Sequence, residues 1–259
     1  MGNDQVKKII ATGKGGVGKT TTLTALSMMM AREGKRVIVF DTDPSMNLAL
    51  SFGIPYQNIS TITEDKAVIS HELEEEGIEV SGEEILNEHS AVTKDGIRVV
   101  IMGALQYGGA GCLCSAISMI KILLDYVEES GKYDIAIVDS QAGPEVLGRG
   151  LASSFDLNLI LSEPTAKSSE VSVQVKKLAD DLGIKDNILI VNKTDCESDV
   201  EFAAGMVGME LSKSVGVPYD RDVVKADKEG KALLDCFPDS VALASLRSAK
   251  AMVEESIGW

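Results

Sequence analysis

The sequence predicts an α/β fold: a doubly wound, mostly parallel sheet with helices on both faces. Short runs rich in Val, Ile and Leu alternate along the chain with longer segments of helical periodicity. Most of these runs are apolar throughout, which is typical of strands covered on both faces. A glycine-rich loop follows the first run and precedes the first helical segment. The repeated order of a strand followed by a helix implies right-handed crossovers between parallel strands.

Each expected element follows from one of these two patterns. Ligands of such sheets bind at the carboxyl ends of the strands, so residues just after each run are candidates for a site. Strands are expected at residues 6–12, 36–42, 97–105, 133–140, 157–163 and 187–193. Helices are expected at about 18–33, 114–130, 168–182 and 239–257.

Residues 56–96 do not follow the strand-then-helix pattern. They contain HELEEEGIEVSGEEILNEH, which is dense in carboxylates and carries both histidines, His71 and His89. Charge runs of this kind are usually solvated, so we expect a helical, acidic insertion in a single domain that spans residues 1–259. A metal-holding role is possible for these side chains, but no ligand spacing supports it.

Composition limits the partners. The 259 residues carry 40 acidic against 25 basic side chains, a formal net charge of −15. This field repels DNA, RNA and anionic lipid, so neither nucleic acid nor membrane is expected as a partner. The four cysteines form no disulfide framework, and no run reaches the roughly 18 apolar residues of a membrane span. A cytoplasmic location is therefore expected.

The loop GKGGVGKTT, residues 13–21, fits the phosphate-loop pattern G-x-x-x-x-G-K-[ST] between a strand and a helix. Its glycines let backbone N–H groups turn toward a phosphate, and the following helix directs its positive end at the same anion. Lys19 neutralises phosphate charge, and the Thr20 hydroxyl suits Mg²⁺. The sequence thus predicts a P-loop NTPase whose loop binds nucleotide through Gly13, Gly15, Gly16, Val17, Gly18, Lys19, Thr20 and Thr21.

Lys14 adds a second lysine at the start of this loop, giving KGGVGKT. This stretch resembles the deviant Walker A loop of the family that includes MinD, ParA and the nitrogenase iron protein. The resemblance implies an ATPase in which the extra lysine reaches across a nucleotide-bound homodimer to the partner's phosphates. Lys14 and Lys19 are then both catalytic. The alternative for Lys14 is a solvated loop lysine.

Two further motifs are similar to those of the family. DTDPSMN, residues 41–47, is similar to the switch I motif D-x-D-P-x-x-N; this implies that Asp43 orients the attacking water and that Asp41 holds Mg²⁺ through water. Carboxylates at strand ends are also common as helix caps. In IVDSQAG, residues 137–143, Asp139 occupies the Walker B position for Mg²⁺. This stretch departs from the D-T-P-P-G common among MinD and ParA proteins.

The resemblance extends to a base pocket. IVNK, residues 190–193, and GVPYD, residues 216–220, look like the adenine-binding loops of the family. The resemblance implies that Asn192 reads the base edge beside Lys193, and that the backbone of Pro218, Tyr219 and Asp220 closes the pocket. ATP and ADP are the nucleotides it implies.

GAGCLCSAI, residues 109–117, places Cys112 and Cys114 one residue apart. The residues leave several interpretations open. A disulfide would require the loop to bend, buried structural thiols are common near a helix start, and a redox role would need a neighbouring base that is missing. Two thiolates are also half of a tetrahedral site, which a two-fold dimer would complete with the same pair from a second chain. Thiolates accept Ni²⁺, Zn²⁺ or an Fe–S cluster.

The resemblance narrows this choice. The nitrogenase iron protein shares a [4Fe–4S] cluster between two chains, but it needs a cysteine just after switch II, where SQAGPEVLGRGLASS, residues 140–154, has none. The C-x-C pair instead resembles the CooC-type ATPases that assist nickel insertion into carbon monoxide dehydrogenase. RG at 149–150, EPT at 163–165 and KLADDLGIK at 177–185 are also similar.

The CooC-type resemblance implies an ATP-dependent metallochaperone that dimerises when nucleotide or metal binds. Ni²⁺ or Zn²⁺ would lie at the dimer interface between the Cys112 and Cys114 thiolates of two chains, and the client would be a nickel enzyme such as carbon monoxide dehydrogenase. The alternatives are an iron–sulfur cluster carrier or reductase-type ATPase, and a positioning ATPase of the MinD or ParA kind.

Overall fold

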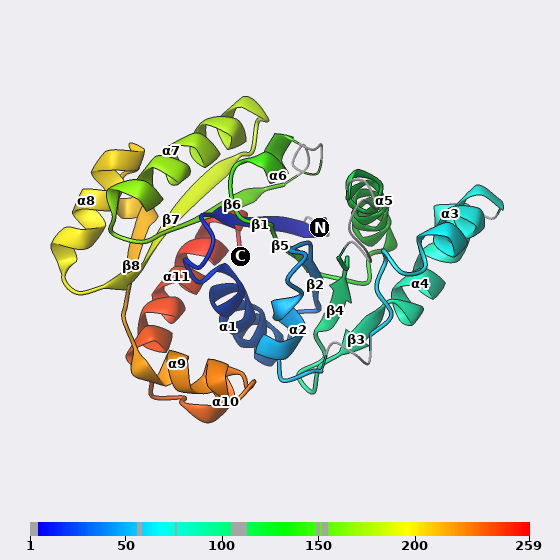
Figure 1. Ribbon diagram of the computed structural model, residues 1–259, viewed down its shortest axis with the longest axis horizontal. Helices are drawn as coiled ribbons and strands as arrows, with labels where there is room; N and C mark the ends of the chain where they lie inside the picture. Colours follow the sequence, from blue (N-terminus) through cyan, green and yellow to red (C-terminus); the bar gives the residue numbers. More distant parts are fainter. Residues whose placement is uncertain (1–4, 56–58, 76, 105–112, 149–150, 152–154) are drawn as a thin grey trace.

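The computed structural model describes residues 5–55, 59–75, 77–104, 113–148, 151 and 155–259. Within them, eight strands form one sheet in the order β3-β4-β2-β5-β1-β6-β7-β8 (Figure 1). All neighbouring pairs are parallel except β3 with β4. The strands are β1 (Lys7–Gly13), β2 (Val37–Asp41), β3 (Ser90–Val92), β4 (Arg98–Ile101), β5 (Ile135–Asp139), β6 (Leu157–Ser162), β7 (Asp186–Thr194) and β8 (Ser214–Pro218).

Two hydrophobic cores lie on opposite faces of this sheet, because apolar residues occupy both sides of each central strand. In β1, Ile9 and Ala11 pack into one core and Ile10 into the other. The first core is covered by α1 (Lys19–Arg32), α2 (Asn47–Ser51), α9 (Arg221–Lys228), α10 (Leu233–Cys236) and α11 (Val241–Ile257). The second is covered by α3 (Lys66–Glu75), α4 (Ile78–Glu88), α5 (Cys114–Ser130), α6 (Glu145–Gly148), α7 (Ala166–Asp181) and α8 (Glu197–Val207). The prediction of a doubly wound fold is confirmed.

The predicted strands and helices agree with this structure to within a few residues, with one larger difference. The strand expected over 97–105 ends at Ile101, where β4 stops. The structure also adds elements that the patterns did not indicate, among them β3, β8, α8, α9 and α10. Between α8 and β8 lies a short 3₁₀ helix, Leu211–Lys213.

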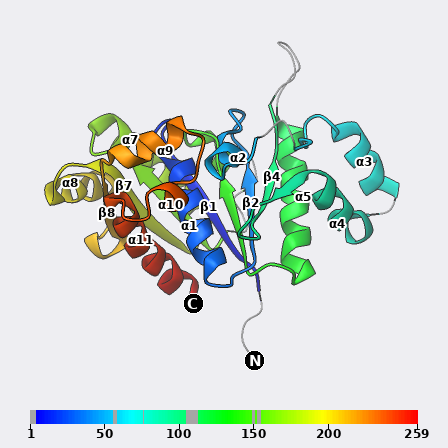
Figure 2. The same ribbon diagram turned by 90° about the horizontal axis from the view of Figure 1, so that it is seen from below.

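The acidic segment forms α3 and α4, which lie at one end of the molecule beside α5 (Figure 2). Helix α4 packs closely on α5, because a Cβ at Gly82 would lie 2.7 Å from the Tyr126 ring. After α4 the segment joins the sheet as β3, which runs antiparallel to β4. The interpretation of 56–96 as an insertion in a single domain stays a prediction. In the part of the chain that the structure describes, no helix is long and apolar enough to cross a membrane.

Candidate functional site

The loop between β1 and α1 has the form of an anion-binding cradle. Gly18, the N-cap of α1, has a φ of 95°, and a Cβ at this residue would lie 2.2 Å from Nδ2 of Asn192. The buried ammonium of Lys19 donates to the carbonyl oxygens of Gly13 at 3.5 Å and of Lys14 at 3.3 Å, so it lies against the loop. Burial lowers the pKa of Lys19, while the carboxylates of Asp139 and Asp43 oppose that shift. A cation thus lies where a phosphate would bind.

Two buried carboxylates lie next to this cradle. Asp41 ends β2, Asp139 ends β5, and the two residues are register partners in neighbouring strands. The Thr20 hydroxyl donates to Oδ2 of Asp139 at 2.6 Å. The other oxygen, Oδ1, is buried and has no hydrogen-bond partner among the described residues. Burial raises the pKa of Asp139 to about 6, and burial together with the Asp139 charge raises that of Asp41 well above its usual range.

Asp41 and Asp43 also shape the turn after β2. Oδ1 of Asp41 accepts from the Asp43 N–H at 3.1 Å, and its Oδ2 accepts from the Leu48 N–H at 3.0 Å, near the start of α2. Oδ1 of Asp43 accepts from the backbone N–H of Ser45 at 2.9 Å. Oxygen ligands of this kind are those that Mg²⁺ prefers. The unpartnered Oδ1 of Asp139, the Thr20 hydroxyl and the Asp41 carboxylate therefore fit a hydrated Mg²⁺ ion.

A cavity of about 690 Å³ extends from the phosphate loop along α1 to a far end formed by Val217, Val223, Val224 and Leu233. It brings together nine of the residues that the sequence nominated. Among its lining residues are Gly15, Gly16, Gly18, Lys19, Thr20, Thr21, Asp43, Asn192 and Lys193. This volume lies in the range of small-molecule sites.

Pro218, Tyr219 and Asp220 follow directly after Val217, but the described lining of the cavity does not include them. The Asp220 carboxylate is engaged elsewhere. It accepts from the Asp222 N–H at 2.8 Å, the Ser240 hydroxyl at 2.6 Å and the Ala242 N–H at 3.3 Å. These bonds fix the starts of α9 and α11, which both contribute residues to the cavity wall. The carboxylate thus holds the wall in place.

The structure adds contacts that the motifs did not indicate. The N–H of Gly143 donates to the Gly13 carbonyl at 3.0 Å, which joins the segment after β5 to the phosphate loop. Lys193 Nζ forms an ion pair with Oε1 of Glu163 at 2.5 Å. The sequence marked Glu163 only as part of EPT at 163–165, a stretch similar to the CooC-type family, and did not indicate this ion pair.

Of the cysteine pair, Cys112 lies outside the described residues, as does RG at 149–150. Cys114 is exposed and is the first residue of α5. The segment that leads to it begins beside the carboxylates, because the Met102 N–H donates to the Asp41 carbonyl at 2.9 Å. Among the described residues, no group of three or more His, Cys, Asp or Glu side chains is arranged to hold a metal ion.

Comparison with known proteins identifies the domain. The sequence profile of CbiA, the CobQ/CobB/MinD/ParA nucleotide binding domain, matches residues 8–234. The chain belongs to this family. It is a P-loop ATPase, and the recognition of the MinD/ParA family from the sequence is confirmed.

Three known proteins illustrate the similarity. The chain is 33% identical over 240 residues to the carbon monoxide dehydrogenase accessory protein CooC of Rhodospirillum rubrum, covering 89% of this chain and 90% of that protein. It is 35% identical over 234 residues to an ATP-binding protein of Methanocaldococcus jannaschii, covering 87% and 90%. The septum site-determining protein MinD of Pyrococcus horikoshii, complexed with Mg-ADP, superposes with a TM-score of 0.73 at 19% identity, covering 96% of this chain and 95% of that one. This last likeness shows the fold alone.

Proposed function

We propose that this ATPase is a metallochaperone that uses ATP to deliver nickel to a client enzyme such as carbon monoxide dehydrogenase. The observation that carries the proposal is the place of Cys114. It begins α5, the first helix after β4, and β4 is followed by Met102, whose N–H bonds to the carbonyl of Asp41. The helix that Cys114 begins thus follows a strand whose end bonds to Asp41, the first residue of the predicted switch I motif. The similarity to CooC along 89% of the chain supports the same client class.

The nucleotide part of the proposal assigns a role to each residue. ATP or ADP binds with its phosphates on residues 13–21 and its base near Asn192, Lys193 and residues 218–220. Thr20, Asp41 and Asp139 hold Mg²⁺, which neutralises charge on the phosphates when it is bound. Lys19 and Lys14 are the catalytic cations, Lys14 acting on the partner's phosphates, and Asp43 orients the attacking water.

The metal part requires a homodimer. Each chain contributes Cys112 and Cys114, and four thiolates complete a tetrahedral set for one Ni²⁺ or Zn²⁺ ion, which is cargo. The positive end of the α5 dipole favours negatively charged ligands at Cys114. ATP binding forms the dimer and loads the site, and hydrolysis resets the dimer and releases the metal.

Metal analysis of the anaerobically purified protein, with ATP and with ADP, tests this proposal. We expect one metal ion per dimer in the wild type. We expect none after Cys112→Ala and Cys114→Ala together, because neither chain then retains a thiolate of the proposed site. Cys196→Ser is the matched control, since Cys196 is the exposed N-cap of α8 and serine retains a polar cap there. Light scattering gives the oligomeric state of each sample. Unchanged metal content in the double variant would contradict the shared site.

The same samples separate the alternatives. Broad visible absorption with stoichiometric iron and sulfide would favour an iron–sulfur carrier or reductase. ATP-dependent sedimentation with lipid vesicles or DNA would favour a positioning ATPase of the MinD or ParA kind. The mixed charges of LRSAKAMVEESIGW at 246–259 argue against membrane docking through a basic amphipathic helix.

A further inference from the structure

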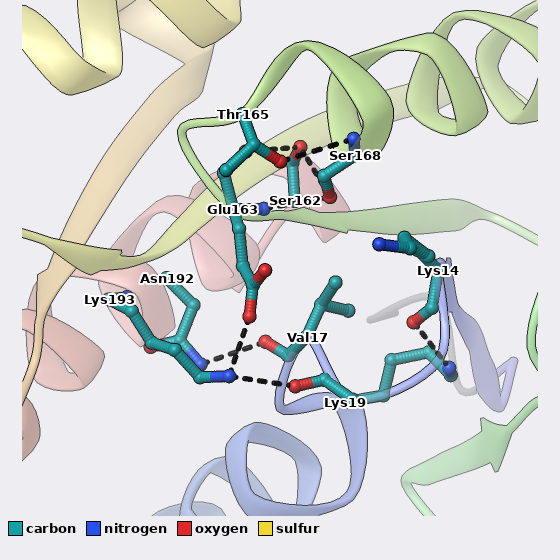
Figure 3. A network of polar contacts seen from close by, with 10 residues as sticks. Lys14, Val17, Lys19, Ser162, Glu163, Thr165, Ser168, Asn192 and Lys193 are labelled. Atoms are coloured by element: carbon teal, nitrogen blue, oxygen red, sulfur yellow. Dashed lines mark hydrogen bonds and ion pairs between the residues drawn. The ribbon is translucent and has the colours of Figure 1, made fainter.

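Lys193 has an unusual backbone conformation behind the phosphate loop. Its φ is 60°, in the left-handed region that residues with a side chain rarely adopt. The pairing of β7 with β8 also shifts register between Asn192 and Thr194. In a regular strand, successive side chains point to opposite faces. The irregularity lets the neighbouring side chains of Asn192 and Lys193 both face the phosphate loop (Figure 3). Strain of this kind is retained where the surrounding structure uses it.

Both side chains bind carbonyl oxygens of the loop. Lys193 Nζ donates to the Gly16 carbonyl at 3.0 Å, and Asn192 Nδ2 donates to the Val17 carbonyl at 2.8 Å. In a trans peptide the C=O and the following N–H point in opposite directions. Holding these two carbonyls from behind therefore directs the N–H groups of Val17 and Gly18 away from β7. Those N–H groups belong to the part of the loop that cradles phosphate.

Glu163 holds Lys193 from the other side and is itself well anchored. Oε1 of Glu163 lies 2.5 Å from Lys193 Nζ. Its N–H donates to the Ser168 hydroxyl at 2.9 Å, and its carbonyl accepts from the Thr165 N–H at 2.7 Å. Thr165 is the N-cap of the sixteen-residue helix α7. Figure 3 shows the resulting series of contacts, from α7 through Glu163 and Lys193 to the phosphate loop.

We propose that Glu163 is a positioning residue for nucleotide binding, which acts through Lys193 to hold the phosphate loop in its phosphate-binding form. The Lys193 side chain is 44% exposed and lies beside an anion site, so without a carboxylate it is free to turn toward solvent or phosphate. Glu163 fixes the ammonium on Gly16 instead. The inference concerns ATP binding alone and does not depend on the metal.

A double-mutant cycle tests this inference. Glu163→Gln keeps the size of the side chain and removes its charge, and Lys193→Gly removes the ammonium while allowing the positive φ. For Glu163→Gln we expect the KM for ATP to rise about fivefold with kcat within about twofold, because uniform binding is lost. In the Lys193→Gly background, Glu163→Gln is expected to change KM by less than about 1.5-fold. Glu163→Asp should recover part of the affinity.

The direction of the KM change, and whether it persists without the Lys193 ammonium, distinguish the proposal from a simple charge effect. If Glu163 acted only as a negative charge near the phosphates, its neutralisation would lower KM at low salt, and the same change would persist in the Lys193→Gly background. Either result would overturn the proposal. Lys176→Ala is the control, because it removes the Lys176–Asp180 ion pair within α7 and, among the described residues, Lys176 forms no hydrogen bond or ion pair with the phosphate loop. This variant should leave KM unchanged. Circular dichroism of each variant verifies folding.

Discussion

Gly13→Ala is expected to lower the free energy of unfolding by about 3 kcal/mol or more and to abolish nucleotide binding. A Cβ at Gly13 would lie 2.2 Å from the Leu161 carbonyl oxygen, far inside contact distance. Leu161 is the register partner of Gly13 in the adjacent central strand, so this oxygen has no room to retreat. The φ of 140° adds strain for any residue with a side chain. Because β1 passes into the phosphate loop at Gly13, a displaced strand end would also distort the loop.

Gly34→Ala separates the steric contact from the backbone strain as causes of the lost stability. Gly34 also has a positive φ, of 91°, but a Cβ there would meet no atom within 4 Å. It therefore reports the cost of a positive φ without a steric contact, about 1 to 2 kcal/mol. Thermal unfolding and titration with a fluorescent ADP analogue measure both effects. A Gly13→Ala protein that melts at the same temperature as Gly34→Ala, and binds nucleotide normally, would contradict the argument from the Leu161 contact.

The sequence predicted the phosphate loop well because its chemistry is local. Gly13 to Thr21 are contiguous, and the strand before and the helix after them are strong patterns. The carboxyl-end rule for parallel strands brings Asp41 and Asp139 to the same edge of the sheet. The structure agrees, with the two residues as register partners.

The far end of the cavity could not be predicted in the same way. Its wall consists of β8, α9, α10 and α11, and α9 has only eight residues, so its apolar face of Val223, Val224 and Ala226 is too short to stand out in the sequence. The role of Asp220 as a cap for two helices depends on Ser240 and Ala242, twenty and twenty-two residues away. Contacts of this kind follow from packing, and no local motif encodes them.

The contacts of Lys193 illustrate a second limit. Its partner Gly16 lies 177 residues away in the sequence, and the contact depends on a left-handed backbone at a residue that is not glycine. Strand β3 was missed for a different reason: it has only three residues, lies at the sheet edge and shows no apolar alternation. Such short edge strands take their conformation from the neighbouring strand, here β4.

Asp139→Asn is expected to affect stability and activity in opposite directions. ATP hydrolysis should fall by at least about 100-fold, the scale of removing one preorganised electrostatic group. The nucleotide-free protein should instead become more stable near neutral pH, by about 1 to 3 kcal/mol. The fully buried carboxylate of Asp139 lies beside Asp41, and one of its oxygens has no hydrogen-bond partner among the described residues. The Lys19 charge and the Thr20 hydroxyl offset only part of the cost of burial. An amide removes that charge and still accepts from the Thr20 hydroxyl.

The pH dependence gives the sign of the stability effect. Burial raises the pKa of Asp139 from 3.8 to about 6, so the folded protein binds this proton more tightly than the unfolded chain. The contribution of Asp139 to wild-type stability therefore falls as the pH rises from about 4 through about 6, and Asp139→Asn should gain stability relative to wild type over this range. Asp134→Asn is the control of opposite sign, since hydrogen bonds from Arg36 lower the pKa of Asp134 and its charge stabilises the fold. Urea unfolding at several pH values measures both variants.

Adding ATP and Mg²⁺ should make the wild type more stable than Asp139→Asn, because ligand binding stabilises only a protein that can bind the ligand. An Asp139→Asn protein less stable than wild type at neutral pH without nucleotide would show that the buried charge is compensated.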